Sequence, residues 1–502
     1  MSRARARLAD RFRRIFAIEA AAGILQWDQA VWMPRGGAEL RGRELATLAR
    51  IAHDLLADPV VGEWLAEAEA DGDADPWVRA DLREMRRRHL RARAVDPALV
   101  ERLQEATTRA ELVWREARAR SDFALFAPRL AEVVDLVRER ARQLGTALGL
   151  APYDALLDGY QPGLGDAEVT RLFAPLARHL PHLVEDALAR RREPLRPARE
   201  FPPEAQRRLA RELVARLGFD FDHGRLDEST HPFCGGAPPD VRMTARYDPR
   251  DPLSGIMAVI HETGHALYSQ GLPRDRLGLP VGEDRGIAVH ESQSLLMEMK
   301  LARSRPFLHW LAGRLEAHFG PEPAFAPDNL VRLVQRVERG CIRVDADELT
   351  YPLHVILRWR LERALLAGEL AVSELPAAWR EGMAELLGVV PPDDRRGVLQ
   401  DIHWSLGAFG YFPCYTVGAL LAARLFAAMR RDLADLDEDL AEGRFERILA
   451  WLRRRVHARA ARDTWTELVR EATGGPLDVD AFFHQLHERY GVHRVDAAEG
   501  RP

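Results

Sequence analysis

Two histidines and a glutamate lie close together near the middle of the chain. The sequence reads His-Glu-Thr-Gly-His from His261 to His265, and on a helix this spacing places both imidazoles on one face. Both rings can then reach one metal ion, while Glu262 lies where it can take a proton from water. This pattern is typical of a zinc hydrolase. The alternative is a pair of histidines that only form hydrogen bonds inside a packed helix.

Local signals predict a helix around this motif. Asp251 can cap its N-terminus, and Pro252 suits its first turn. Gly271 and Pro273 are expected to end it. The residues between carry an apolar stripe at spacings of three and four, formed by Leu253, Ile256, Met257 and Ile260.

A catalytic zinc site also needs a third protein ligand and an open position for water. Glu291 lies 26 residues after His265, in another predicted helix at about 286–302, which leaves room for a loop and a second helix that crosses the first. The sequence after His265 lacks an H-x-x-G-x-x-H continuation, so a third histidine close behind is excluded. From the residue types alone, Glu291 is either the third ligand or an ordinary exposed acid.

The composition is that of a soluble globular protein, with 502 residues, 47% hydrophobic and 30% charged. The net charge is −5 and both signs are mixed along the chain, so we expect no nucleic-acid partner. No uncharged apolar window is long enough to cross a membrane, and the Arg-rich N-terminus lacks the features of a secretory signal. Only three cysteines occur, which favours a reducing compartment, and the cytoplasm is our expectation.

Helical periodicity extends through most of the chain. It fails after Gly218, where alternating apolar residues indicate a short half-buried strand: Val241, Met243, Ala245 and Tyr247. We therefore predict a mainly α architecture with a small β-element before the metal helix and a cleft between two helical halves. Besides 286–302, the predicted helices lie at about 4–30, 38–57, 77–95, 98–145, 166–192, 204–217, 327–338, 346–369, 376–387, 413–431 and 443–473.

Several short segments together resemble the thermostable carboxypeptidase Taq-type metallocarboxypeptidases. The resemblance covers nearly the full length and is densest from His231 to Gly418. The marker segments occur in the family's order: H-P-F at 231–233, D-V-R-M-T at 240–244, H-E-T-G-H at 261–265, H-E-S-Q at 290–293, I-R-V-D-A-D at 342–347 and G-V-L-Q-D-I-H-W at 397–404. Two positions depart from the expected pattern: Met297 replaces an aromatic residue and Cys414 a small hydroxyl residue.

The resemblance implies one large helical domain over residues 1–502 with a deep active-site groove, usually found as a homodimer. An N-terminal helical half would span about 1–217, and a metal-binding half about 218–502. The family binds one zinc ion per chain, which cobalt or manganese can replace, and removes single C-terminal residues from peptides with a free C-terminus and broad preference. Carried over by position, the metal ligands are His261, His265 and Glu291, and the general base is Glu262.

The resemblance also suggests roles for three residues after the last marker segment. Related helical zinc peptidases place a histidine and a tyrosine over the metal from the equivalent region. We therefore assign His403 and Tyr411 to stabilise the oxyanion of the tetrahedral intermediate, with Tyr415 in reserve. Core packing is the alternative for these aromatic side chains.

A carboxypeptidase must also bind a free α-carboxylate, which a planar guanidinium does with paired hydrogen bonds. Arg343 and Arg242 each lie in a marker segment; we favour Arg343 as this anchor and expect Arg242 to be structural, tied to Asp240. His231 is expected to donate to the substrate backbone, with a structural role in its turn as the alternative. Three further polar residues could orient the ligand histidines: Asp345, Asp347 and Gln400.

Two other functions compete with this interpretation. A helical zinc oligopeptidase that cleaves internally or releases dipeptides shares the metal pattern, and a C-terminal amide on the substrate would distinguish it, because an amide stops only a carboxypeptidase. A non-catalytic helical binding protein with a vestigial pocket belongs to another class. Loss of Glu262 or of a ligand would have indicated it, and all of them are intact.

Overall fold

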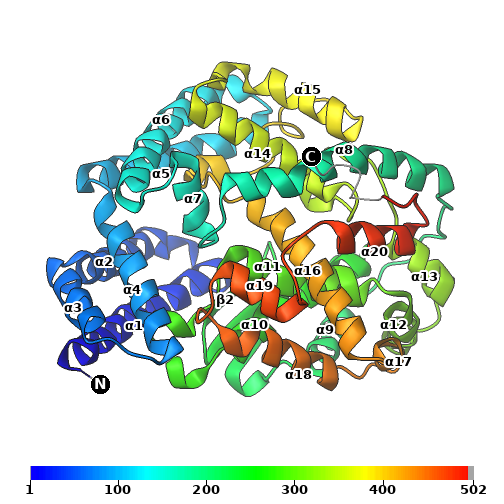
Figure 1. Cartoon of the computed structure of the whole chain (residues 1–502). Helices are drawn as coiled ribbons and strands as arrows, with labels where there is room; N and C mark the ends of the chain where they lie inside the picture. The colour runs from blue at the N-terminus through cyan, green and yellow to red at the C-terminus, as the bar shows by residue number, and fades with distance from the viewer. Residues whose placement is uncertain (1, 496–502) are drawn as a thin grey trace.

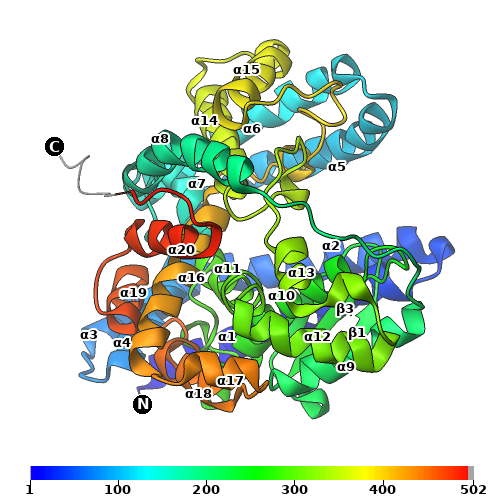
Figure 2. The same cartoon turned by 90° about the vertical axis from the view of Figure 1, so that its right-hand side faces the viewer.

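Helices make up most of residues 2–495, the part of the chain that the computed structural model describes (Figures 1 and 2). The predicted mainly α architecture with one small sheet is confirmed. The α-helices are α1 (Arg3–Val31), α2 (Ala38–Ala57), α3 (Pro59–Ala70), α4 (Pro76–Ala94), α5 (Pro97–Arg120), α6 (Phe123–Leu148), α7 (Pro152–Tyr160), α8 (Asp166–Arg190), α9 (Pro203–Arg216), α10 (Pro252–Gly271), α11 (Ile287–Leu295), α12 (Arg305–Phe319), α13 (Pro327–Val334), α14 (Tyr351–Ala367), α15 (Leu375–Leu387), α16 (Pro413–Asp432), α17 (Leu436–Ala441), α18 (Glu446–Arg455), α19 (Trp465–Thr473) and α20 (Asp480–Tyr490). Three shorter segments lie near the site: the π-helix η5 (Leu296–Ala302) and the 3-10 turns η7 (Arg343–Asp345) and η9 (His403–Leu406).

Two long predicted helices are each broken in the structure. The segment 98–145 forms α5 and α6, because Ser121 adopts a left-handed conformation with φ of 55° and Asp122 then caps α6. The segment 443–473 forms α18 and α19, and Thr464 begins α19 with a capping box. Periodicity continued across both breaks, but local capping decided where the helices end.

Five helices of the structure were not predicted as separate elements: α3, α7, α12, α17 and α20. The first three carry proline in their first turn. Proline is tolerated there because the first N–H groups of a helix have no partner inside the helix. A proline that looks like a break in the sequence therefore marks the start of a new helix at these three places.

The small sheet lies directly before α10 in the chain, as predicted. Its strands are β1 (Gly224–Glu228), β2 (Cys234–Ala237) and β3 (Asp240–Ala245). The central β3 pairs in parallel with β1 and antiparallel with β2. Val241, Met243 and Ala245 of β3 are buried, and β3 packs against α10, whereas Tyr247 lies beyond the strand. The sheet therefore supports one face of the helix that carries the metal motif.

Two hydrophobic cores hold the described chain together. The larger core includes residues from Ala106 to Val492 and so joins elements from both sides of residue 218. The smaller core is formed by residues of α1 to α4 together with Leu279 and Val281. These first four helices gather at the lower left of Figure 1, while α10, α11 and α16 lie near the centre in both views. The division into halves near residue 217 stays a prediction.

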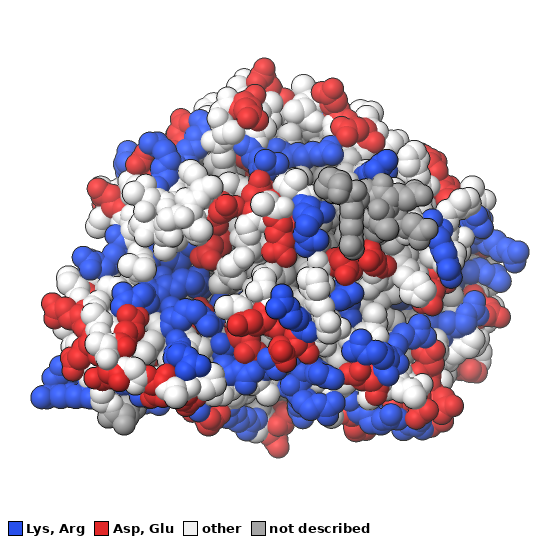
Figure 3. Space-filling view, in the orientation of Figure 1, with Lys and Arg blue, Asp and Glu red and all other residues white. Residues whose placement is uncertain are grey.

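Charged side chains of both signs are interspersed over the face shown in Figure 3. This agrees with the nearly balanced count of 72 basic and 77 acidic residues. Within residues 2–495, no helix combines the length and the apolar character that are needed to cross a bilayer.

Candidate metal centre and substrate groove

A groove of about 1620 Å³ lies between α1 and elements of the chain after residue 195. Residues from α1, β2, α10, α11, η5 and η7 line it. The lining includes the three ligands expected from the sequence and also Glu262 and Arg343. Elements far apart in the chain therefore bring most of the predicted site residues to one cavity.

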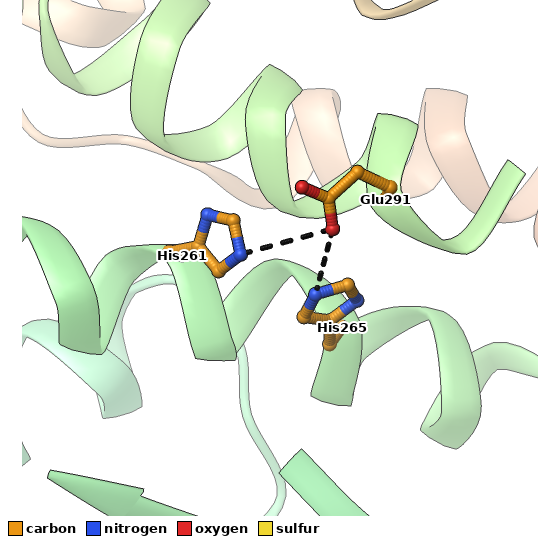
Figure 4. Close-up of side chains that lie close together, drawn as sticks. All are labelled: His261, His265 and Glu291. Carbon is orange, nitrogen blue, oxygen red and sulfur yellow. Dashed lines mark ion pairs between the residues drawn. The ribbon is translucent and has the colours of Figure 1, made fainter. Parts of the chain in front are cut away.

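The three expected ligands converge on one point (Figure 4). The Nε2 atoms of His261 and His265 lie 3.9 Å and 3.4 Å from Oε2 of Glu291, and the ligand atoms of the three residues all lie within 4.8 Å of one another. A tetrahedral zinc ion with bonds of about 2.0–2.1 Å holds its ligand atoms roughly 3.4 Å apart. The spacing and the His2Glu donor set therefore fit a zinc ion.

Close packing of two helices places Glu291 above the histidines. Gly264 of α10 lies against α11, and a Cβ atom there would come within 2.5 Å of the carbonyl oxygen of Gln293. On its other side, α11 packs against Gly418 of α16, where a Cβ atom would lie 3.0 Å from that of Glu291. Glycine at both positions lets α11 fit between α10 and α16, so the glycine in the motif has a structural reason.

Each ligand histidine is held from behind by a different partner. Nδ1 of His261 lies 3.0 Å from Oε2 of Glu298 in η5, and the guanidinium of Arg303 pairs with the same carboxylate at 2.7 Å. Burial alone would raise the pKa of Glu298, but Arg303 and His261 lower it to about 2, so this group is a carboxylate. A carboxylate at Nδ1 fixes the ring and leaves Nε2 free to face the ligand cluster.

The second ligand, His265, has a neutral partner. Its Nδ1 lies 2.6 Å from Nδ1 of His290, whose Nε2 in turn lies 3.5 Å from Oγ of Ser269. Burial, followed by the nearby His265, lowers the pKa of His290 to about 4. With Nε2 of His265 facing Glu291, its Nδ1–H donates to His290, which fixes the tautomer of both rings.

Glu262 lies beside the ligands on α10 and is only 8% exposed, yet it lines the groove. Burial is the main reason that its pKa is raised, to about 7, and the carboxylate of Glu291 adds to the effect. A buried acid with a raised pKa next to the ligand cluster can hold and release a proton.

Arg343 faces the same groove from η7, and its side chain is largely buried. Its Nε and Nη2 donate to Oδ1 of Asp401 at 3.0 Å and 2.9 Å, and its Nη1 donates to the hydroxyl of Tyr351 at 3.1 Å. Burial alone would lower the pKa of Arg343, but Asp401 raises it overall, so the guanidinium is charged. The groove thus contains a fixed cation that can face an anionic group.

Tyr411 and Tyr415 line the groove, whereas His403 lies behind them. Nε2 of His403 is 3.2 Å from the Tyr415 hydroxyl, and its ring packs against those of Tyr411 and Phe412. Burial raises the pKa of both tyrosines and lowers that of His403 to about 4. The two hydroxyls therefore stay protonated as donors. His403 contacts Tyr415 and is not part of the groove lining, and its expected role over the metal stays a prediction.

His231 and Arg242 lie outside the groove lining in the described structure. The His231 side chain is exposed, and its neighbours Pro232 and Phe233 contribute to the lining instead. Arg242 makes a two-pronged pair with Asp240 at 2.9 Å and 2.7 Å, and its guanidinium stacks on Trp27. Arg242 thus has a structural environment, and the role of His231 toward a substrate stays a prediction.

The polar residues expected to orient the ligand histidines hold a loop instead. Asp347 accepts backbone N–H groups of Glu338, Leu349 and Thr350, and Gln400 bonds the backbone at Arg343 and Cys341. Asp345 lines the groove with no bond to a ligand among the described contacts. Glu298 and His290 orient the histidines; the sequence held a signal for Glu298, which follows Glu291 by seven residues on the same helix face.

The two departures from the family pattern are both buried. Met297 is 2% exposed in η5, and Cys414 is 0% exposed at the start of α16. Cys234, Cys341 and Cys414 are free thiols, and burial raises the pKa of each of them. Cys414 is buried and Cys234 and Cys341 are half-buried, and the raised pKa values disfavour reactive thiolates at all three positions.

Comparisons with known proteins agree with the geometry. A family model described as carboxypeptidase Taq (M32) metallopeptidase matches residues 7–490. Thermostable carboxypeptidase 1 of Thermus thermophilus is 41% identical over 496 residues, which cover 96% of this chain and 97% of that protein. The solved structure of Trypanosoma cruzi metallocarboxypeptidase 1 has a TM-score of 0.95 at 38% identity and covers 97% of this chain and 99% of its own. The M32 carboxypeptidase of Deinococcus radiodurans has a TM-score of 0.93 at 33% identity, with 98% and 100% covered. The resemblance seen in the sequence is therefore confirmed, and the chain belongs to the carboxypeptidase Taq family of metallopeptidases.

Proposed function

We propose that this metallocarboxypeptidase uses one zinc ion to remove single residues from the free C-termini of peptides, with broad preference. One observation supports the proposal above the others. The His261–His265–Glu291 cluster, the buried acid Glu262 and the guanidinium of Arg343 all line the same groove. A peptide in this groove can therefore meet a metal, a proton acceptor and a carboxylate anchor together.

Zinc is the metal that the donor set favours, because two imidazoles and one carboxylate are a common catalytic combination for it. Cobalt and manganese accept nitrogen and oxygen ligands as well and are expected to substitute. A bound metal ion would polarise the scissile carbonyl and lower the pKa of water at its open position.

Glu262 is proposed as the general base. It accepts a proton from the attacking water and returns it to the nitrogen of the leaving amino acid. Its raised pKa favours this exchange, because a group that is too acidic holds a proton poorly. Its place on α10, next to His261, keeps the carboxylate close to the ligand cluster.

Tyr411 and Tyr415 are proposed to donate to the oxyanion of the tetrahedral intermediate. Both side chains line the groove, and burial raises the pKa of each hydroxyl, so both remain protonated. His403 supports this function indirectly, because it lies in contact with Tyr411 and Tyr415.

Arg343 is proposed as the anchor of the substrate α-carboxylate. It is a fixed, charged guanidinium in the groove lining, and a carboxylate is the group that such a fork binds best. Anchoring the C-terminus at Arg343 would hold the last residue of the peptide in the same groove as the metal ligands, which would make the enzyme an exopeptidase.

A set of peptides, each prepared with a free C-terminus and as the C-terminal amide, tests this function. The zinc-loaded protein should shorten the free acids by one residue at a time and leave the amides intact, as followed by mass spectrometry. Internal fragments, or products shorter by two residues, would instead assign the protein to the helical zinc oligopeptidases. Hydrolysis should stop when the metal is chelated and return with zinc.

We also propose that the enzyme acts in the cytoplasm as a homodimer. Three free cysteines suit a reducing compartment, and the family resemblance supports the dimer. Sedimentation equilibrium at micromolar concentration would test the dimer by giving about twice the mass of 56.6 kDa.

A further inference from the structure

Arg343 shares its counter-ion with a second arginine. Oδ1 of Asp401 accepts from Nε and Nη2 of Arg343, while its Oδ2 accepts from Nε of Arg358 at 2.7 Å. Burial alone would raise the pKa of Asp401, but Arg358 and Arg343 hold it well below its usual range. Two guanidinium groups and one carboxylate therefore leave the cluster with a net charge of +1.

Arg358 cannot itself touch a peptide in the groove. It belongs to α14, its side chain is 0% exposed, and it is absent from the groove lining, whereas Arg343 is part of that lining. The guanidinium lies over the ring of Trp379 at 4.5 Å. Its Nη1 donates to the carbonyl of His354 in the preceding turn at 2.8 Å. These contacts fix the charge directly behind Asp401.

Asp401 is the one acid that pairs with Arg358 in the described contacts; Arg358 also lowers the pKa of nearby Glu362, but burial outweighs this and raises that pKa to about 7. Glu362, one turn further along α14, accepts from Tyr153, Trp404 and the Gly410 N–H rather than from Arg358. Burial of His354 lowers its pKa well below its usual value, so this ring adds no charge. The extra cation of the cluster is thus held inside the protein.

This extra charge matters for an incoming carboxylate. Arg343 and Asp401 alone would form a neutral pair, and Asp401 would repel the substrate carboxylate while Arg343 attracts it. Since the cluster is buried, solvent screens these charges poorly. At an effective dielectric constant of about 20, a unit charge about 10 Å away changes the affinity for an anion roughly tenfold.

We propose that Arg358 is a positioning residue for carboxylate binding, because it balances Asp401 and so leaves the charge of Arg343 available for the C-terminus of the substrate. Asp401 holds the guanidinium of Arg343 in place, and the positive charge of Arg358 offsets the negative charge of Asp401. This inference rests on the proposed role of Arg343 as the anchor.

The test compares binding of one peptide as free acid and as amide by calorimetry. The proteins are zinc-loaded and carry Glu262→Gln to prevent turnover, and the measured quantity is the ratio of the two affinities. Arg343→Met should abolish the preference for the acid. Arg358→Met should reduce it about tenfold, while Arg358→Lys, which keeps the charge, should retain most of it.

Two further variants separate charge from structure. Asp401→Asn combined with Arg358→Met returns the cluster to +1 and should restore most of the preference, and Asp401→Asn alone should increase it. Circular dichroism and thermal unfolding show whether each variant is folded. If Arg358→Met is unstable, the affinity ratio of Asp401→Asn tests the proposal instead.

The outcomes are distinguishable. If the parent protein shows no preference for the acid, or Arg343→Met keeps it, the proposed anchor is wrong. If Arg343→Met loses the preference but Arg358→Met keeps it, Arg358 has no such role. The inference is equally overturned if the double variant binds no more selectively than Arg358→Met, or if Asp401→Asn alone lowers the preference.

Discussion

The two sides of the groove are built in different ways. On the metal side, His261, His265 and Glu291 stand on helices α10 and α11, and helical spacing sets their positions. On the anchor side, Arg343 lies in a short 3-10 turn, and its partner Asp401 lies in the loop before η9. Backbone geometry therefore fixes the metal side, whereas a network of buried charges fixes the anchor side.

This difference predicts how each side fails. A ligand or base on the metal side is one of a small set with no substitute, so its loss should stop the reaction. The anchor side distributes its work over Arg343, Asp401 and Arg358, so single changes there should alter the affinity for the free acid by graded amounts and in either direction. The predictions below test this contrast, beginning with the largest effect.

Replacing Glu291 by alanine should abolish metal binding and with it all hydrolysis. The two histidines alone leave zinc with two protein ligands, and the affinity should fall far below that of the three-ligand site. Metal analysis after gel filtration measures the occupancy. Glu19→Ala is the matched control, since Glu19 also lines the groove but lies outside the ligand cluster. Full zinc occupancy in Glu291→Ala would exclude it as a ligand.

Replacing Glu262 by glutamine should leave the metal bound and reduce kcat by roughly 10²–10⁴-fold. The amide has almost the size of the carboxylate but cannot accept the proton. Steady-state kinetics with a chromogenic peptide, together with metal analysis, would show both effects. Turnover close to that of the parent protein would rule out Glu262 as the base and weaken the contrast between the two sides.

Replacing Glu298 by glutamine should weaken zinc binding by about 10–100-fold without preventing it. The amide can still meet Nδ1 of His261, but it lacks the charge that orients the ring and raises its basicity. Competition with a fluorescent chelator measures the affinity. Arg303 donates to the same carboxylate and helps to hold it in place. Arg303→Met should therefore also weaken zinc binding. An unchanged affinity in both variants would mean that Glu298 only packs the helix.

The sequence alone could predict the metal side because period and spacing determine it. His261 and His265 share a face on any regular helix, and Glu291 required only a second helix that crosses the first. The family resemblance added the choice of Glu291 as third ligand and of Arg343 as anchor. The buried residues of β3 could also be predicted, because the alternation of apolar and polar residues lies within one short segment of the chain.

The supporting contacts could not be predicted from the sequence. Asp401 reaches Arg343 over 58 residues, and Arg358 reaches Asp401 over 43. No local pattern relates such pairs, and the position of His403 behind Tyr415 depends on the same long-range packing. Local capping also decided helix ends that periodicity did not show, as at Ser121.

The smallest predicted effect concerns Glu362, which ties the anchor-side loop to α7 through Tyr153 and the Gly410 N–H. Burial raises the pKa of Glu362 from 4.5 to about 7, and its hydrogen bonds oppose the shift only in part. The folded state therefore binds more protons than the unfolded state between these pH values, so this group lowers stability as the pH rises from about 5 to 8.

In the parent protein, ionisation of Glu362 should lower the free energy of unfolding by roughly 2 kcal/mol between pH 5 and pH 8. Glu362→Gln should remove this decrease. Urea denaturation at the two pH values measures it. Glu348→Gln is the matched control with the opposite sign: burial alone would raise the pKa of Glu348, but Arg489 and Lys300 lower it overall. Its carboxylate therefore stabilises the folded protein at neutral pH, and this stabilisation is lost as the pH falls. Glu348→Gln should remove this increase in the free energy of unfolding with rising pH. Parallel pH profiles for Glu362→Gln and the parent protein would show that the anchor-side loop is held by hydrogen bonds whose strength is independent of the charge on Glu362.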